Sequence, residues 1–196
     1  MSGKEIKAKL KRLLREAAKK GKSGKVILEL FAGKGRIAAA VRRAGKHGAL
    51  ALDIALGVWG DLKNKFVLQV LRGWITSGRI AGVWLAFPCT TFSLARHPAL
   101  RSSAEPRGMK CWRTFVREQA LIEQGNRTMD AAVDLANCCL HSGVPAALEN
   151  PIGSYAWKCH GLQKLCRHRC VRSCRVDFCR FGCRWRKRML IVAVHG

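Results

Sequence analysis

The chain has 196 residues, of which 37 are Lys or Arg and 12 are Asp or Glu, so its formal net charge is +25. That length suits one domain with a single core, and an apolar fraction of 48% predicts a folded chain rather than a disordered one. The charge favours a polyanionic partner, above all nucleic acid, and leaves DNA and RNA equally open.

Two other classes of protein are disfavoured. No apolar run is long enough to span a bilayer, and the basic start lacks the apolar core of a secretion signal. Ten cysteines would suit a secreted disulfide scaffold, but a chain this rich in aliphatic residues does not need such cross-links. We therefore expect an intracellular, reducing compartment. The charge favours the nucleus, and an organelle stays open.

The first predicted element is a basic amphipathic helix over 4–20, which ends at the Gly- and Ser-containing segment 21–24. Its apolar face consists of Ile6, Leu10, Leu13, Leu14 and Ala17. The opposite face carries Lys and Arg, either as the solvated side of a helix packed on the core or as a nucleic-acid arm. We treat 1–24 as this N-terminal helix and 25–196 as the main domain.

From Val26 onward, short apolar runs alternate with helical stretches. This pattern predicts an α/β domain with a mainly parallel central sheet and helices on both faces. We expect strands over 26–31, 49–52, 80–86, 144–148 and 189–194, the last of which closes the sheet. We expect helices from the first turn through Arg42, over 63–77 and over about 115–141, with a polar loop over 93–108. The Cys- and Arg-rich segment 158–188 has no clear assignment.

The turn after the first strand reads Glu29-Leu30-Phe31-Ala32-Gly33-Lys34-Gly35-Arg36. Glycines at this point let the backbone approach a ligand, and the following helix presents free N–H groups to it. Asp53 ends the next strand, where a carboxylate accepts hydrogen bonds from ribose hydroxyls. The turn lacks the Lys-Ser/Thr ending of a P-loop, so triphosphate binding is disfavoured.

The strand over 80–86 leads into Phe87-Pro88-Cys89-Thr90-Thr91-Phe92-Ser93. In open α/β sheets, reacting groups gather at the carboxyl ends of the strands. A thiol in that position is a candidate nucleophile if nearby cations or a helix N-terminus favour its thiolate. The alternative is a small thiol that only packs in the core.

Several motifs, in order, resemble those of the cytosine-C5 DNA methyltransferase family. The glycine turn is similar to the first motif of S-adenosylmethionine-dependent methyltransferases, and the segment around Cys89 resembles the Pro-Cys-x-x-Phe-Ser motif. Glu149-Asn150 resembles the Glu-Asn motif, and 181–188 resembles the Gln-x-Arg-x-Arg motif. The resemblance covers roughly 26–194 and implies a Rossmann-like methyltransferase fold.

The resemblance also implies S-adenosylmethionine as the cofactor. It assigns the cofactor site to Glu29, Phe31, Ala32, Gly33, Gly35, Asp53, Ile54, Asp61, Leu62 and Pro88. Cys89 would add to carbon 6 of cytosine, Glu149 would share a proton with ring N3, and Asn150 would hold the geometry of the site. Arg186, or Arg188 in its place, would contact the base carbonyl or a phosphate. DNA is favoured over RNA, and a duplex target would be flipped out of its stack.

The chain departs from the family at several points. Phe87 replaces the first proline of Pro-Pro-Cys, Arg184 stands where Gln is usual, and Pro151 stands where Val is common. The chain also stops shortly after the arginine motif, before the family's target-recognition region. We therefore expect sequence recognition to be absent, minimal or supplied by another protein chain. The chain would be a compact variant, with a fragment of a larger polyprotein as the alternative.

Two other functions remain open. One is amino methylation of adenine, which needs Asp or Asn before the proline where this chain has Phe87. The other is a catalytically silent methyltransferase-fold subunit that binds RNA or DNA in a larger assembly, for which the high charge argues. An intact Cys89, Glu149 and glycine turn argue against this loss of activity.

The segment 158–188 combines cysteines with arginines. Cys166, Cys170 and Cys174 recur at steps of four and would line one helix face, with Cys179 close by. Their spacing lacks the paired Cys-x-x-Cys of common zinc modules, so we expect packing thiols, with zinc as the lesser alternative. The segment is also the best candidate for nucleic-acid contact, through Arg167, Arg169, Arg172, Arg175, Arg184 and Trp185.

Overall fold

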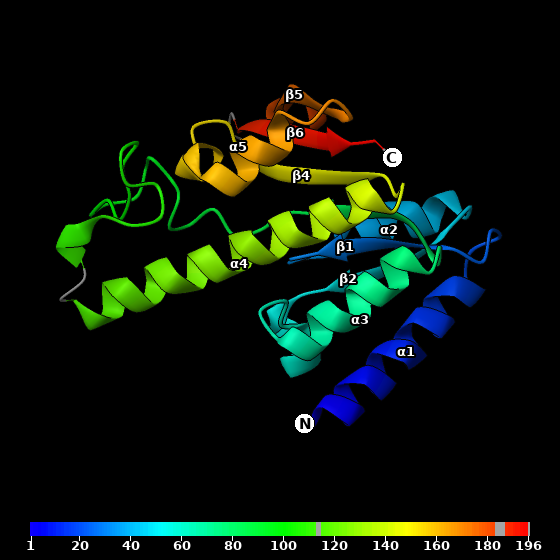
Figure 1. Ribbon diagram of the computed structural model, residues 1–196. Helices are drawn as coiled ribbons and strands as arrows, with labels where there is room; N and C mark the ends of the chain where they lie inside the picture. The colour runs from blue at the N-terminus through cyan, green and yellow to red at the C-terminus, as the bar shows by residue number, and fades with distance from the viewer. Residues whose placement is uncertain (113–114, 183–186, 196) are drawn as a thin grey trace.

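The computed structural model describes residues 1–112, 115–182 and 187–195 (Figure 1). The helices are α1 (Gly3–Lys19), α2 (Arg36–Ala44), α3 (Lys65–Thr76), α4 (Val116–His141) and α5 (His160–Cys166). The strands are β1 (Val26–Leu30), β2 (Gly48–Leu52), β3 (Ile80–Leu85), β4 (Ala146–Pro151), β5 (Val171–Asp177) and β6 (Arg188–Val194). Short 3₁₀ turns lie at 54–56, 58–60, 110–112, 155–158 and 178–181.

The strands form one sheet in the order β2-β1-β3-β4-β6-β5. The pairings β1–β2, β1–β3 and β3–β4 are parallel, whereas β6 is antiparallel to both of its neighbours, β4 and β5. The fold is therefore α/β, but its sheet is mixed, and the expected mainly parallel sheet is corrected on this point.

The expectation that 189–194 closes the sheet is also wrong, because β5 is the edge strand and β6 lies inside it. Arg172, Ser173, Cys174 and Arg175 of β5 are all exposed. An edge strand with little to bury carries no apolar alternation, so the sequence of β5 does not mark it as a strand.

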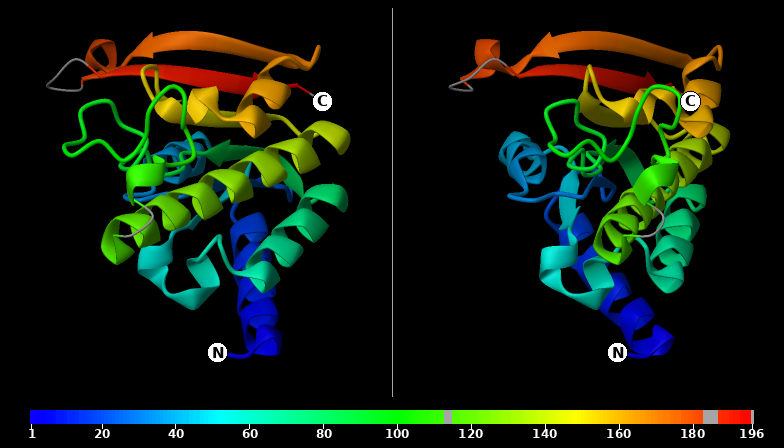
Figure 2. Two further views of the ribbon diagram at one scale, coloured as in Figure 1. Left: turned by 60° about the vertical axis from the view of Figure 1, so that its left-hand side comes forward. Right: turned by 90° about the vertical axis from the view of Figure 1, so that its left-hand side faces the viewer.

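Helices lie on both faces of the sheet, as expected. The helix α2 packs on β1 and β2, while α1, α3, α4 and α5 form a continuous layer on the other face (Figure 2). The connections between the strands determine which face of the sheet each helix covers. Crossover connections of the same handedness that move in opposite directions along a sheet place their helices on opposite faces. The step from β1 to β2 runs against the later steps to β3 and β4.

The predicted N-terminal helix is confirmed, and it belongs to the layer of helices that α3, α4 and α5 also form. The Ser2 hydroxyl and the Glu5 carboxylate form a capping box that starts α1. Ile6, Leu10, Leu14 and Ala17 are buried against α3 and β2, and Leu13 is partly buried. In the described part of the chain, no helix is both long enough and apolar enough to cross a membrane.

Candidate active site

The chain reverses its direction of travel across the sheet at β1. It passes from β1 to β2 on one side, and then returns to β3 on the other side of β1. Ligands of open α/β sheets bind in the crevice at the carboxyl ends of the strands at such a switch point. The two turns singled out from the sequence, after Leu30 and after Leu85, both begin there, and the Ala86 amide donates a hydrogen bond to the Leu30 carbonyl (3.3 Å).

The glycine turn has an unusual backbone. Phe31 has φ of 58° and Gly33 has φ of 51°, both in the left-handed region. A bulky residue rarely adopts this conformation, and such strain is concentrated at functional sites. A Cβ atom added to Gly33 would meet no atom within 4 Å, so the space above this glycine is open to a ligand.

Glu29 lies on β1 and connects this strand to the start of α2. It is only 5% exposed, and its carboxylate accepts hydrogen bonds from the backbone amides of Ala38 (2.7 Å) and Ile37 (3.3 Å) at the start of α2. These bonds satisfy helix amides that have no partner within the helix. The structure thus gives Glu29 a positioning role for the turn.

Asp53 links the second strand to the glycine turn. Its carboxylate accepts hydrogen bonds from the amides of Gly33 (2.9 Å) and Ala55 (3.0 Å). The next residue, Ile54, is 54% exposed and lies beside the exposed side chains of Leu56 and Val58. The two halves of the predicted cofactor site, 31–35 and 53–54, are therefore in direct contact.

The remaining predicted cofactor residues differ in their accessibility. Asp61 is half-buried and accepts a hydrogen bond from the Lys63 amide (2.9 Å), with the Lys63 ammonium 3.8 Å away. Leu62 is buried in the core, whereas Pro88 is exposed beside Cys89. Leu62 contributes packing to the site.

The turn that carries Cys89 is anchored by two phenylalanines. Phe87 and Phe92 are buried, and their rings meet edge to face with centroids 6.3 Å apart. The Cys89 carbonyl accepts a hydrogen bond from the Phe92 amide (2.9 Å), and the Cys89 side chain stays partly exposed. Phe87, a departure from the family pattern, holds the cysteine at the rim of the sheet.

Asn150 connects this turn to β4. It is 1% exposed, and its side-chain amide donates a hydrogen bond to the Phe87 carbonyl (3.0 Å). Its Oδ1 atom is buried and has no hydrogen-bond partner among the described residues. The Pro-Cys turn and the Glu-Asn pair, far apart along the chain, are therefore in contact in the structure.

Glu149 has an environment suited to proton transfer. Burial raises the pKa of its carboxyl group, while the Lys187 ammonium and the Trp84 indole act in the opposite direction, and Glu29 adds to the rise. The shift favours the neutral carboxyl group, which can donate a hydrogen bond. Sequence analysis did not identify Lys187, which lies at the end of the arginine motif.

Arg101 is a buried residue beside the candidate site that the sequence did not reveal. It is 1% exposed, and its guanidinium group lies 3.7 Å from the centre of the Phe92 ring. It donates hydrogen bonds to the carbonyl and hydroxyl oxygens of Thr91, to the carbonyls of Pro106 and Ile122, and to the side-chain oxygen of Asn126. Burial lowers the pKa of Arg101 to about 10, so it stays charged at neutral pH. It fixes the segment after Cys89 against α4.

The structure describes only some of the arginines that the sequence predicts to contact nucleic acid. Arg188 starts β6, where its Nε atom lies 3.7 Å from the Asp177 carboxylate. Arg184, Trp185 and Arg186 lie outside the described residues. The other predicted nucleic-acid contacts are exposed on β5 and on the turn before it: Arg167, Arg169, Arg172 and Arg175.

The expectation that Cys166, Cys170 and Cys174 line one helix face is wrong. The helix α5 ends at Cys166, Cys170 lies in a turn, and Cys174 lies on β5, because 171–177 pairs with β6 as a strand. Cys179 follows in a 3₁₀ turn. Among residues 1–112, 115–182 and 187–195, no cluster of three or more Cys, His, Asp or Glu side chains has a geometry that would hold a metal ion.

Comparisons of the chain with known protein families, with curated proteins and with solved structures found no match.

Proposed function

We propose that the chain is an S-adenosylmethionine-dependent methyltransferase with a Rossmann-like methyltransferase fold. It acts on carbon 5 of cytosine in nucleic acid, with DNA favoured, through a covalent adduct with Cys89. The observation that carries the proposal is the hydrogen bond from Asn150 to the Phe87 carbonyl, which joins the Glu-Asn pair to the Pro-Cys turn.

The residues at the switch point fit the cofactor. Open space above Gly33 admits a ligand against the backbone, and the Asp53 carboxylate has acceptor capacity left for ribose hydroxyls. The exposed Ile54 side chain offers an apolar surface to the adenine ring. When bound, S-adenosylmethionine supplies an electrophilic methyl group.

Cys89 and Glu149 have different chemical roles toward the base. Carbon 5 of cytosine becomes nucleophilic once the Cys89 thiolate has formed a bond to carbon 6. In its protonated form, the Glu149 carboxyl group donates to ring N3 and stabilises the negative charge that the addition places on the ring. After methylation of carbon 5, a base removes the proton from this carbon, the C6–S bond breaks, and the thiolate is restored.

The test is methyl transfer from labelled S-adenosylmethionine to cytosine-containing DNA and RNA. Wild-type protein and Cys111→Ala, which removes an exposed thiol elsewhere, should both form labelled 5-methylcytosine. Cys89→Ala should reduce the label to background. DNA with 5-fluorocytosine should form a stable covalent adduct with proteins that retain Cys89 and none with Cys89→Ala, because fluorine cannot leave as the proton does.

Two results would overturn the proposal. Label that persists in Cys89→Ala would exclude this nucleophile. No transfer to either polymer, while cofactor and nucleic acid both bind, would identify a catalytically silent binding subunit.

A further inference from the structure

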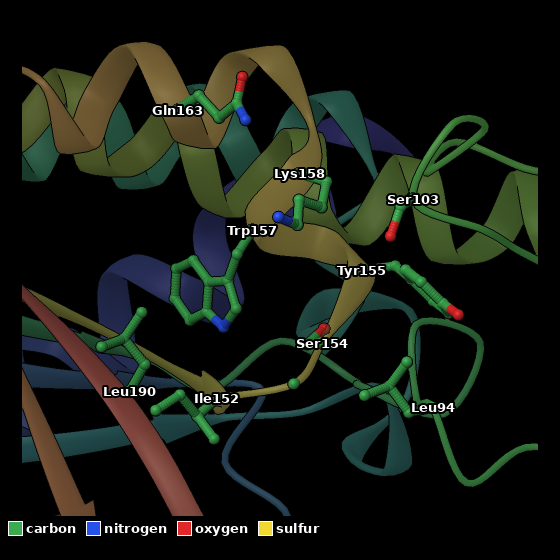
Figure 3. A pocket seen from close by; sticks show the side chains of 10 residues that line it. Leu94, Ser103, Ile152, Ser154, Tyr155, Trp157, Lys158, Gln163 and Leu190 are labelled. Carbon is green, nitrogen blue, oxygen red and sulfur yellow. The ribbon is translucent and has the colours of Figure 1, made fainter.

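A pocket of about 370 Å³ lies beside the candidate active site (Figure 3). Its apolar walls come from Leu94, Ile152, Tyr155, Trp157 and Leu190, and its polar groups from Ser103, Ser154, Lys158 and Gln163. Small-molecule sites range from about 300 to 1,000 Å³, so this pocket has room for one nucleotide and none for a duplex.

The pocket is built onto the turn that carries Cys89. Leu94 and Ser103 belong to the loop after Cys89, and Ile152 follows the Glu149-Asn150 pair on β4. The Tyr155 amide donates a hydrogen bond to the Phe92 carbonyl (2.9 Å), which joins the two walls. A ligand in the pocket would therefore contact both the loop that follows Cys89 and the turn that follows the Glu149-Asn150 pair.

The walls are fixed before any ligand binds. The Trp157 indole donates a hydrogen bond to the Pro151 carbonyl (2.8 Å), which sets the orientation of its ring. The Ser154 hydroxyl accepts a hydrogen bond from the Ala156 amide (3.2 Å) and shapes the 3₁₀ turn between β4 and α5. A Cβ atom on Gly153 would lie 2.7 Å from Leu94 Cδ1, so a glycine allows the loop to approach closely.

The chemistry of the lining suits a nucleobase and its phosphate. Figure 3 shows the Lys158 ammonium on one side of the Trp157 ring, with Ile152 and Leu190 on the other side and the Gln163 amide above. An aromatic ring stacks on any base, an amide can donate to and accept from a base edge, and an exposed ammonium attracts a phosphate. The net charge of +25 favours this anionic ligand over a neutral apolar one.

We infer that this pocket takes one nucleotide of an unpaired segment beside the target cytosine, with its base on Trp157 and its phosphate at Lys158. The inference rests on the proposed function for the identity of the neighbouring base. The pocket would add a contact with the substrate through residues that have no assigned role in the reaction.

The test measures binding of a single-stranded oligonucleotide that contains adenine, thymine and one 2-aminopurine but no cytosine, without S-adenosylmethionine. The fluorescence of 2-aminopurine should fall on binding as the base stacks. Trp157→Leu should weaken binding about 5- to 150-fold. Trp157→Phe retains a ring without the indole hydrogen bond and should keep most of the quenching.

Lys158→Ala has a matched control in Lys164→Ala, which removes the same charge from α5 outside the pocket. The slope of log affinity against log salt should become less steep by about 0.7 in Lys158→Ala, because the protein then neutralises one phosphate fewer. The slope should stay unchanged in Lys164→Ala.

Equal losses in the two lysine variants, or wild-type binding by Trp157→Leu, would overturn the inference. So would equal loss of binding and of melting temperature in Trp157→Leu and Trp157→Phe, which would make Trp157 purely structural. None of these measurements requires methyl transfer. The nucleotide site can therefore be confirmed when the proposed reaction is not observed, and the reaction can be confirmed when the nucleotide site is not.

Discussion

At the scale of single residues, Glu149 connects the stability of the protein to its chemistry. Burial raises the pKa of its carboxyl group in the folded state, so folding favours the protonated form. The stability that this protonation contributes is complete below the unfolded-state pKa and is lost as the pH rises through the folded-state pKa. Ionisation of this carboxyl group therefore costs stability, and the fold tolerates that cost at this position.

Glu149→Gln should remove this cost, because glutamine keeps the shape of the neutral carboxyl group. As the pH rises from the ordinary carboxyl pKa of 4.5 through the raised folded-state pKa, the melting temperature of the wild type should fall relative to that of Glu149→Gln. Glu123→Gln, at an exposed position on α4, provides the control and should follow the wild type. Parallel curves for all three proteins would show that the environment of Glu149 has no net effect on its protonation.

The same variant should lose activity while it gains stability, because a glutamine has no proton to transfer. Methyl transfer at saturating substrate should fall by about 10²- to 10⁴-fold. A variant that becomes more stable and less active at once is expected of a site residue and not of a packing residue.

Residues differ in how far the sequence alone identifies them. Cys89 and the Glu149-Asn150 pair stand in short motifs at strand ends, so a local pattern suffices to select them. Arg101 stands in a polar loop of a chain with 37 Lys and Arg residues, where nothing local distinguishes it from a surface arginine. Its partners come from three segments of the chain, which only the fold brings together.

At the scale of elements, α4 supports the Cys89 turn through a glycine in the middle of the helix. A Cβ atom on Gly125 would lie 2.3 Å from Thr91 Oγ1 and 2.9 Å from the Arg101 guanidinium. Glycine within a helix normally costs about 0.5–1 kcal/mol relative to alanine. The close approach of the loop explains why this cost is accepted here.

Gly125→Ala should therefore destabilise the protein by about 1–3 kcal/mol through overpacking, and should reduce methyl transfer by shifting the loop after Cys89. Gly73, in the middle of α3, is a matched control, since an added Cβ atom meets no atom within 4 Å. Gly73→Ala should stabilise the protein by up to about 1 kcal/mol. Urea unfolding measures both, and a gain in stability from both substitutions would contradict the proposed role of Gly125.

The elements that the sequence identifies are those with buried faces. The predicted strands and long helices are found within a few residues because their apolar residues recur with the period of a strand or a helix. The sequence assigns neither the seven-residue helix α5 nor the strand over 171–177. The latter is exposed along most of its length. It borders solvent on an edge of the sheet, so its residues satisfy the backbone pairing with β6 without an apolar pattern.

At the scale of the whole molecule, two groups of basic residues lie at opposite edges of the sheet. One is the solvated face of α1, with Lys4, Lys7, Lys11, Arg12 and Arg15, which packs beside the edge strand β2. The other includes Arg167, Arg169 and Arg175 around β5. Leu190 of β6 pairs with both Asn150 and Arg175, so this arginine lies two strands, about 10 Å, from the candidate site.

The two surfaces lie on opposite sides of the reaction. The edge strand β2 is two strands from β3, which leads to Cys89, and β5 is two strands from β4, which carries Asn150. The strand β2 is five strands from β5, roughly 24 Å at the usual spacing between strands. A nucleic acid with one base at Cys89 and its neighbour at Lys158 would continue toward β5 rather than toward α1. The β5 arginines should therefore contribute to productive binding, whereas the α1 face should contribute mainly to nonspecific attraction.

Two charge-matched triple variants separate these roles. Arg167→Gln with Arg169→Gln and Arg175→Gln should weaken binding of cytosine-containing DNA and make its salt dependence less steep, by up to about 0.9 for each phosphate that is no longer neutralised. Methyl transfer at low DNA concentration should fall with it. Lys4→Gln with Lys11→Gln and Arg15→Gln removes the same charge from exposed positions of α1 and should leave methyl transfer close to that of the wild type. Equal effects of the two variants would mean that net charge alone governs binding, and a larger effect of the α1 variant would place the path of the nucleic acid along the opposite edge of the sheet.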